Sequence, residues 1–408
     1  MARKHKLARR LGLVLVTIYG LGNIVGAGIY ALIGKVAGEA GTATPLAFLI
    51  AMLVAGLSAL SFAELSSSHP YSEGATAYVH AAFKRKNASL IVGLIMSLAT
   101  LVSAAALARA FGGYLNSATG ILLPVGAVLI ILLFGLMVAW GIEESAKLAA
   151  LLTIIEVIGL GMIIWFGRES LNLATQNFGQ FFDFATVGLA GVLSGVFLAF
   201  YAYIGVEDMV HLSEETKKTR TTMPLAIILA VLIATVLYIL VAIVAIDTIP
   251  IAELNESVAP LSLVFNKISN TPGWVIIIIA LAASAGGVLA HIISGSRLLY
   301  GMAEAGWLHR HLAIVHERRK TPVVTILIVV VISSILAMFV DIKILASTTS
   351  FLILLIFSLV NSSLMIIKLR KSASRQPHFR VPLVVPALGL LSCLGLLIFQ
   401  TISVFNLV

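Results

Sequence analysis

The sequence predicts an all-α integral membrane protein with about eleven transmembrane helices. The chain is 60% hydrophobic and only 11% charged over 408 residues, which is far outside the range of a soluble domain of this length. Long apolar runs recur along the whole sequence, each close to or above the roughly 20 residues that cross a bilayer as a helix. We place the spans at 11–34, 45–67, 88–118, 121–140, 146–167, 187–210, 223–247, 274–300, 321–340, 344–368 and 384–406.

Lys and Arg fall in alternate loops, and this pattern predicts the orientation. Of the 27 basic residues, 22 lie at the N-terminus and in every second loop, which is typical of the cytoplasmic side. The N-terminus is therefore expected in the cytoplasm of a cell-membrane protein and, with eleven spans, the C-terminus outside. The first span lacks a small-residue cleavage site and reads as retained. The net charge of +9 is spread in small groups between spans, which argues against a nucleic-acid surface.

The chain reads as one membrane domain, 1–408, because no stretch between spans is long enough for a soluble domain. Its single cysteine, Cys393, lies in an apolar run and is expected to be a buried, inert thiol. No disulfide or thiolate metal site is available within one chain.

Two spans look interrupted in corresponding places. The first carries the run Gly22–Tyr30 (G-N-I-V-G-A-G-I-Y), and the sixth carries Phe200–Asp208 (F-Y-A-Y-I-G-V-E-D). Breaks in membrane helices are tolerated where they line a cavity, and two broken helices five spans apart indicate an inverted-repeat transporter. We expect repeats at 11–167 and 187–368, with 384–406 as an additional helix. The G-x-x-x-G within the first run is also a common packing motif, whereas a dinucleotide loop is excluded because no strand precedes it.

The chain resembles the amino acid–polyamine–organocation superfamily of permeases. The resemblance rests on the two interrupted runs, on Pro70–Tyr78 and Gly141–Lys147, and on Ser296–Leu308 followed by Thr321-Pro322. It covers nearly the whole chain and implies the LeuT-like fold of two inverted five-helix repeats, with an amino acid as solute. We count eleven spans where many members have twelve.

The resemblance also implies a substrate site at the two breaks, where backbone amides hold the solute carboxylate and carbonyls hold its amine. The helix dipole favours an anion at the start of the second half-helix, and glycine lets the backbone approach the ligand closely. Tyr201 resembles the aromatic gate that covers the solute, although it is also one of several aromatic residues on its helix. The expected substrate-binding residues are Gly26, Ala27 and Gly28 for the carboxylate, Ile24, Tyr201 and Ile204 for the amine, and the adjoining Ala202 and Gly205.

Glu156 stands in the middle of the fifth span, where many members of this family carry a lysine. A carboxyl group in apolar surroundings favours its neutral form, so Glu156 is a candidate for proton coupling. The alternative is a protonated side chain that only holds the unwound backbone open. Other charged residues in spans are less prominent: Glu64, Glu207 and Asp208 are expected to pair with basic loops, and His291 is expected to be packed.

The leading hypothesis is a proton-coupled carrier of amino acids that works by alternating access in the lipid bilayer. An exchanger and a polyamine or organic cation carrier remain open, as does sodium coupling through carbonyls and Ser284. The sequence lacks the rings of charge expected of a channel. It also lacks the clustered His, Asp or Glu expected of a membrane enzyme. We expect no enzyme activity, no cofactor, no metal and no nucleic-acid partner.

Overall fold

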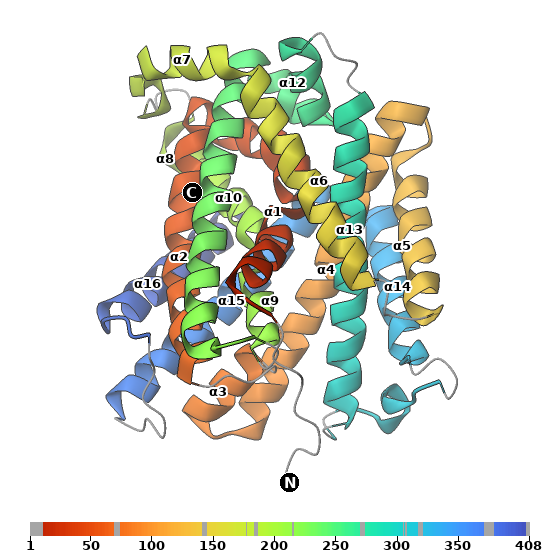
Figure 1. Ribbon diagram of the computed structural model, residues 1–408, viewed down its shortest axis with the longest axis vertical. Helices are drawn as coiled ribbons and strands as arrows, with labels where there is room; N and C mark the ends of the chain where they lie inside the picture. Colours follow the sequence, from red (N-terminus) through yellow and green to blue (C-terminus); the bar gives the residue numbers. More distant parts are fainter. Residues whose placement is uncertain are drawn as a thin grey trace.

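The computed structural model describes residues 11–68, 74–140, 145–176, 178–182, 187–213, 216–269, 274–304, 306, 308–316, 321–370 and 379–404. These residues form helices and connecting turns, with one isolated bridge between Leu11 and Thr216. The long helices stand side by side in a single bundle (Figure 1). The predicted all-α fold is therefore confirmed.

The long helices coincide with the predicted apolar runs. They are α1 (Leu13–Ala40), α2 (Thr44–Ser68), α4 (Lys86–Thr119), α5 (Leu123–Trp140), α6 (Ser145–Phe166), α8 (Gly188–Phe200), α10 (Thr219–Thr248), α13 (Trp274–Glu304), α14 (Val323–Phe339), α15 (Ile342–Leu369) and α16 (Val384–Val404). The sixth run is divided into α8, the 3₁₀ turn η3 (Tyr201–Tyr203), α9 (Val206–Met209) and the 3₁₀ turn η4 (Val210–Leu212).

Short helices that we did not predict cap the two ends of the bundle. They are α3 (Ala75–Phe83), α7 (Arg168–Gln176), α11 (Ile251–Glu256) and α12 (Pro260–Ile268), with the 3₁₀ turns η1 (Gly41–Ala43), η2 (Phe178–Phe182) and η5 (Arg310–Ala313). We did not predict them because they lie outside the long apolar runs that indicate membrane spans. Figure 1 shows α7 and α12 at one end of the bundle and α3 at the other.

Eight helical stretches of the described chain are long and apolar enough to span a membrane. A ninth qualifies if the bent pair Leu151–Phe166 and Arg168–Ala174 is one span. Two further apolar helices, Leu13–Gly26 and Val323–Phe339, are shorter. A multi-pass membrane protein is thus confirmed, and the count of eleven spans stays a prediction.

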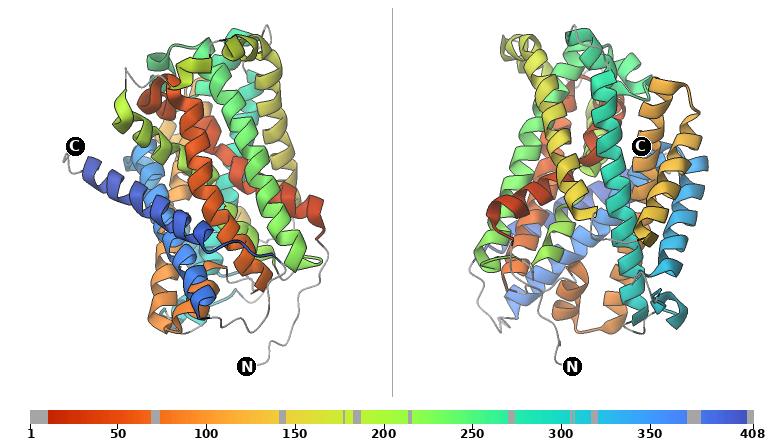
Figure 2. Two further views of the ribbon diagram at one scale, coloured as in Figure 1. Left: turned by 90° about the vertical axis from the view of Figure 1, so that its left-hand side faces the viewer. Right: turned by 45° about the vertical axis from the view of Figure 1, so that its right-hand side comes forward.

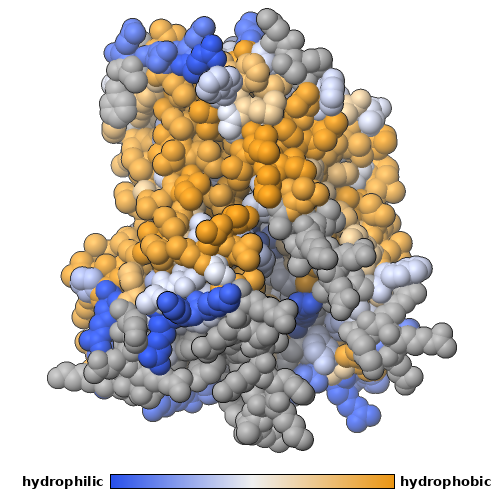
Figure 3. Space-filling model, in the orientation of Figure 1, coloured by the Kyte–Doolittle hydropathy of each residue, from blue (hydrophilic) through white to orange (hydrophobic). Residues whose placement is uncertain are grey.

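The outer surface of the bundle is apolar around its middle. Leu136 on α5 is 71% exposed and Leu391 on α16 is 66% exposed, which a water-soluble protein would disfavour as part of a continuous band. The space-filling view shows this hydrophobic band between more hydrophilic ends (Figure 3). The band is the surface that lipid would cover.

The basic loops gather at one end of the bundle, as the alternation predicts. Lys217 donates its backbone N–H to Leu11 O over 2.8 Å, and the Arg370 side chain donates to Ala82 O over 2.6 Å, so these two bonds join four segments next to basic loops in two pairs. At the opposite end, Lys343 pairs with Glu39. The assignment of the basic end to the cytoplasm stays a prediction.

Helix α1 begins at the basic end, whereas α8 begins near α7 at the opposite end (Figure 1). The two broken helices therefore run in opposite directions, as an inverted repeat requires. The division into repeats at 11–167 and 187–368, and the single domain, stay predictions.

Helix α16 lies on the outside of the bundle (Figure 2) and packs on α15 and α2. Polar contacts anchor it. Glu64 of α2 is 4% exposed and forms an ion pair with Lys368 at 2.6 Å, while it accepts the N–H of Val381 at 2.7 Å just before α16. This pairing of Glu64 with a basic residue agrees with expectation. Cys393 on α16 is a buried free thiol, 3.5 Å from the hydroxyl of Ser58.

Candidate functional site

Helix α1 is interrupted at Gly26, whose φ of 19° and ψ of −160° are not helical. A Cβ atom built at Gly26 would have no neighbour within 4 Å, so the backbone faces open space there. Interrupting a helix frees carbonyls on one side of the break and N–H groups on the other. The predicted discontinuity in the first span is therefore present, at the glycine that we placed in the site.

The sixth run is interrupted at Ile204 and Gly205. Ile204 is extended (φ −66°, ψ 139°) and Gly205 is left-handed with φ of 117°. The freed N–H of Gly205 donates to the Glu207 carboxylate over 3.0 Å. Glu207 is 4% exposed and caps the break, and among the described residues it forms no ion pair with a basic loop, which differs from our expectation for this residue. The difference follows from local geometry, because a carboxylate two residues beyond the break reaches its free amide.

The two breaks touch each other. A Cβ atom built at Gly28 would lie 3.0 Å from Cα of Ala202, and one at Gly205 would lie 2.5 Å from the backbone oxygen of Asn23. Such approaches exclude larger side chains at both glycines. Glycine therefore serves close packing at these two positions and leaves open space at Gly26.

The hydroxyl of Tyr238 on α10 contacts the backbone at both breaks, a role that the sequence analysis did not predict. Its hydroxyl lies 2.7 Å from the carbonyl of Ile24 and 2.8 Å from that of Ala202, and donates toward both. These carbonyls belong to the last turns before each break, where intrahelical partners are lost. A tyrosine in an apolar span carries no sequence signal for this role.

A cavity of about 60 Å³ lies between the breaks and the helices α4, α6 and α13. Because one water molecule needs roughly 10–15 Å³ of such space, the cavity has room for about five water-sized groups, the scale of a small zwitterion. Its lining includes Gly22, Asn23, Ile24, Gly26 and Gly28 of α1, Ser103 and Leu107 of α4, Leu152, Thr153 and Glu156 of α6, Tyr201, Ile204 and Asp208 around the second break, and Gly286, Gly287, Ala290 and His291 of α13.

The predicted substrate-binding residues divide into two groups. Ile24, Gly26, Gly28, Tyr201 and Ile204 line the cavity. Ala202 and Gly205 lie behind it: Ala202 packs on Gly28, and Gly205 packs on Asn23. The backbone of Ala27 continues α1 beyond the break, and its side chain lies outside the described part of the chain.

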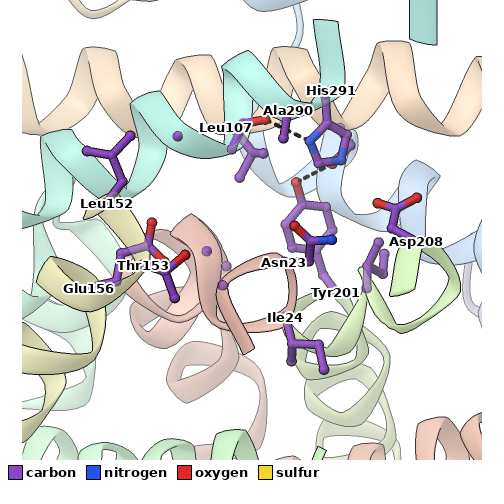
Figure 4. Close-up of a pocket in the computed structure, with 17 residues that line it drawn as sticks. Asn23, Ile24, Leu107, Leu152, Thr153, Glu156, Tyr201, Asp208, Ala290 and His291 are labelled. Atoms are coloured by element: carbon purple, nitrogen blue, oxygen red, sulfur yellow. Dashed lines mark hydrogen bonds between the residues drawn. The ribbon is translucent and has the colours of Figure 1, made fainter. Parts of the chain in front are cut away.

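Glu156 of α6 also lines the cavity and is 3% exposed. Its carboxylate Oε2 is buried and has no hydrogen-bond partner within the described residues. Tyr30 of α1 donates instead to the backbone carbonyl of Glu156 over 2.6 Å. Figure 4 shows Glu156 and Thr153 on one side of the cavity, with Asp208 and His291 on the other. A buried polar atom without a partner is rare and marks a functional candidate.

Tyr201 closes one side of the cavity. The side chain is 5% exposed, and its hydroxyl lies 3.0 Å from that of Ser103 on α4. This hydrogen bond joins the second break to α4. The role of Tyr201 as a gate stays a prediction.

Asp208 and His291 lie closer to the site than we expected. Both line the cavity; Asp208 lies 3.8 Å from Nε2 of His211, and Nδ1 of His291 lies 2.8 Å from the backbone oxygen of Gly287. The sequence signal that could have placed Asp208 at the cavity is its position one turn beyond the break. For His291, only its glycine-rich neighbourhood on α13 pointed to a cavity.

The hydroxyl of Ser284 donates within its own helix, to the carbonyls of Ala280 at 2.6 Å and Leu281 at 3.2 Å. It is not part of the cavity lining. The described residues contain no cluster of three or more His, Cys, Asp or Glu suited to a metal ion.

Comparisons with known proteins agree with this architecture. A family model described as "Amino acid permease" matches residues 11–407. The chain is 29% identical over 422 residues to the branched-chain amino acid permease BcaP of Bacillus subtilis, covering 97% of this chain and 89% of that protein. It is 28% identical over 416 residues to the methylthioribose transporter of Bacillus subtilis, covering 96% and 88%.

The chain is also 29% identical over 390 residues to the vacuolar cationic amino acid transporter 4 of Arabidopsis thaliana, covering 89% of this chain but only 64% of that protein. The family match extends over almost the entire chain, and the helical bundle agrees with the LeuT-like fold. The chain therefore belongs to the amino acid permease family of the amino acid–polyamine–organocation superfamily.

Proposed function

We propose that this protein carries amino acids across the cell membrane by alternating access, and that it couples their movement to protons through Glu156. The observation that carries the proposal is the cavity between two broken helices, lined by the buried carboxylate of Glu156, whose Oε2 has no hydrogen-bond partner among the described residues. The names of relatives support the amino acid as the solute class, since BcaP and the plant protein are both described as amino acid carriers.

The breaks suit the two charges of an amino acid. Beyond Gly26 the second half of α1 starts with free N–H groups and the positive end of the helix dipole, which stabilise a carboxylate. The carbonyl of Ile24 already accepts from Tyr238, but a carbonyl oxygen has two lone pairs and the second is available to an ammonium. Ile204, at the other break, contributes the facing wall.

Alternation would expose this one site to each side in turn, as expected for two repeats that move around a central site. In the proposed cycle Tyr201 covers the solute and swings away to release it. The hydroxyl of Ser103, 3.0 Å away, would hold the closed position. The basic end of the bundle would face the cytoplasm.

Proton coupling follows from the surroundings of Glu156. An ionised carboxylate without a partner is strongly disfavoured in a dry interior, so the carrier loaded with a neutral amino acid would close with a proton on Glu156 and release that proton when water enters from the other side. The empty carrier would return with Glu156 unprotonated. Tyr30, bonded to the Glu156 backbone, would transmit the change to α1.

The test is uptake of radiolabelled amino acids into proteoliposomes with and without an inward proton gradient, for the wild type and Glu156→Gln. We expect saturable uptake that the gradient drives, and loss of gradient-driven accumulation in the variant with exchange retained. Glu169→Gln, an exposed carboxylate on α7, is the matched control and should behave as wild type. Accumulation that ignores the gradient and requires internal amino acid would mean an exchanger, and absence of any amino acid uptake would refute the solute class.

A further inference from the structure

The cavity carries negative charge without a basic partner. Among its described lining residues are two carboxylates, Glu156 and Asp208, and one imidazole, His291, but no Lys or Arg. Asp208 has about a third of its side chain exposed, so water screens it. Glu156 is 3% exposed, and nothing of opposite charge in the lining offsets it.

Two tyrosine hydroxyls near Glu156 donate to backbone carbonyls, and the imidazole of His291 also contacts a backbone carbonyl. From α1, Tyr30 donates to the Glu156 backbone carbonyl rather than to the carboxylate. From α10, Tyr238 donates to the carbonyls of Ile24 and Ala202. The Nδ1 atom of His291 on α13 is engaged with Gly287 O.

The charged residues at the outer end of α6 are remote from this carboxylate. Arg168 and Glu169 of α7, Asp247 of α10 and Lys267 of α12 are all exposed, and none lines the cavity. The described lining therefore offers Glu156 no Lys or Arg as a partner.

The cavity is the space that a positive group from outside the protein could occupy, because Glu156 and Gly26 both line it. The Cβ position of Gly26 is open, with no neighbour within 4 Å. Gly286 of α13 is closely packed instead: a Cβ atom there would lie 3.2 Å from Cδ1 of Leu152 and 3.6 Å from Oε1 of Glu156. A ligand amine would therefore approach the carboxylate from the side of Gly26.

We propose that Glu156 is a single-cation site occupied in turn by a proton or by the side-chain ammonium of the solute. This rests on the proposed function and extends it to the substrate class. A neutral amino acid would cross with a proton taken from the water on one side and released on the other. A diamino acid such as lysine would bring its own positive charge and cross without a proton.

Two consequences follow from one carboxylate that accepts one cation. Both classes of solute move one positive charge per cycle, because the carboxylate is neutralised once in each loaded state. They also respond oppositely to pH. Falling pH protonates Glu156, which favours neutral solutes and weakens the binding of lysine, and rising pH does the reverse.

The experiment uses purified protein in proteoliposomes with leucine and lysine as probes. Each solute is tested under a proton gradient without membrane potential, and under an inside-negative potential without a proton gradient. An entrapped pH dye reports proton entry. We expect leucine uptake to respond to both forces and to acidify the lumen, and lysine uptake to respond to the potential alone without acidification. Each should inhibit the other competitively.

Variants separate the carboxylate from general damage to the fold. In Glu156→Gln, lysine inhibition of leucine exchange should weaken by about tenfold or more, the scale of one lost charge-assisted contact. Glu156→Asp keeps the charge and should keep the difference between the two solutes, while Glu169→Gln should match wild type. A melting curve for each purified variant shows whether it is folded.

The outcomes distinguish this inference from the proposed function. Proton-coupled leucine uptake with no binding of lysine would overturn the single-cation site and leave the carrier proposal standing. Lysine uptake that brings in protons as leucine does would also overturn it. If neither amino acid moves or binds, the proposed function itself is wrong and the inference falls with it.

Discussion

Gly205 adopts a left-handed backbone with φ of 117° and lies against the backbone oxygen of Asn23, which a Cβ atom would approach to 2.5 Å. Both features exclude a side chain, and both act at the contact between the two broken helices. Gly26 differs, because its Cβ position is open. Gly205 allows the two breaks to pack closely against each other, whereas Gly26 leaves room for a ligand.

Gly205→Ala should disrupt the site. The strained backbone costs about 1–3 kcal/mol, and relief of the clash must displace Asn23 and the neighbouring carbonyl of Ile24. We expect a lower melting temperature and amino acid uptake reduced by about tenfold or more. Gly161→Ala is the control, because this exposed glycine of α6 has open space at its Cβ position. Wild-type uptake in Gly205→Ala would contradict the role assigned to this contact.

At the scale of secondary-structure elements, the side chain of Tyr238 links α10 to the two interrupted helical runs, α1 and the run that begins with α8. Tyr238 reaches from α10 to carbonyls of both broken helices at 2.7 and 2.8 Å. It is fully buried, so no water replaces its hydroxyl. Loss of this group would free the two breaks to move independently.

Tyr238→Phe should therefore weaken both stability and solute binding. Leaving buried carbonyls with fewer donors costs about 1–3 kcal/mol, which should lower the melting temperature and raise the KM for uptake. Tyr114→Phe is matched to it: this tyrosine is also fully buried and donates one hydrogen bond, to Tyr30 O at 2.7 Å, away from the cavity. We expect Tyr114→Phe to lose stability with an unchanged KM, and equal KM values for both variants would argue against the coupling.

The apolar runs and the glycine pattern were sufficient to place the long helices and the breaks, because membrane spans need continuous hydrophobicity and broken helices need glycine. Short helices such as α7 and α12 were missed because they lie at the ends of the bundle, where the lipid imposes no pattern. Tyr238 and Glu207 were missed or misassigned because their partners are backbone atoms, which leave no sequence signature.

At the scale of the whole molecule, α1 and α8 enter the bundle from opposite ends (Figure 1) and meet at one cavity. The remaining helices hold that meeting point: α4, α6 and α13 complete its walls, while α2, α15 and α16 are joined by the buried contacts of Glu64. In the proposed cycle, two groups of helices would expose this cavity to each side in turn.

The most direct test of a solute site at the breaks is a cryo-electron microscopy structure of the protein in lipid nanodiscs. The protein would be saturated with an amino acid that the uptake assays identify. The account predicts density for the amino acid in the cavity beside Gly26 of α1, with its carboxylate at the α1 break, Tyr201 covering it and Glu156 lining the same cavity. An unoccupied cavity with the amino acid bound elsewhere, or a continuous α1 helix through Gly26 in the bound state, would contradict it.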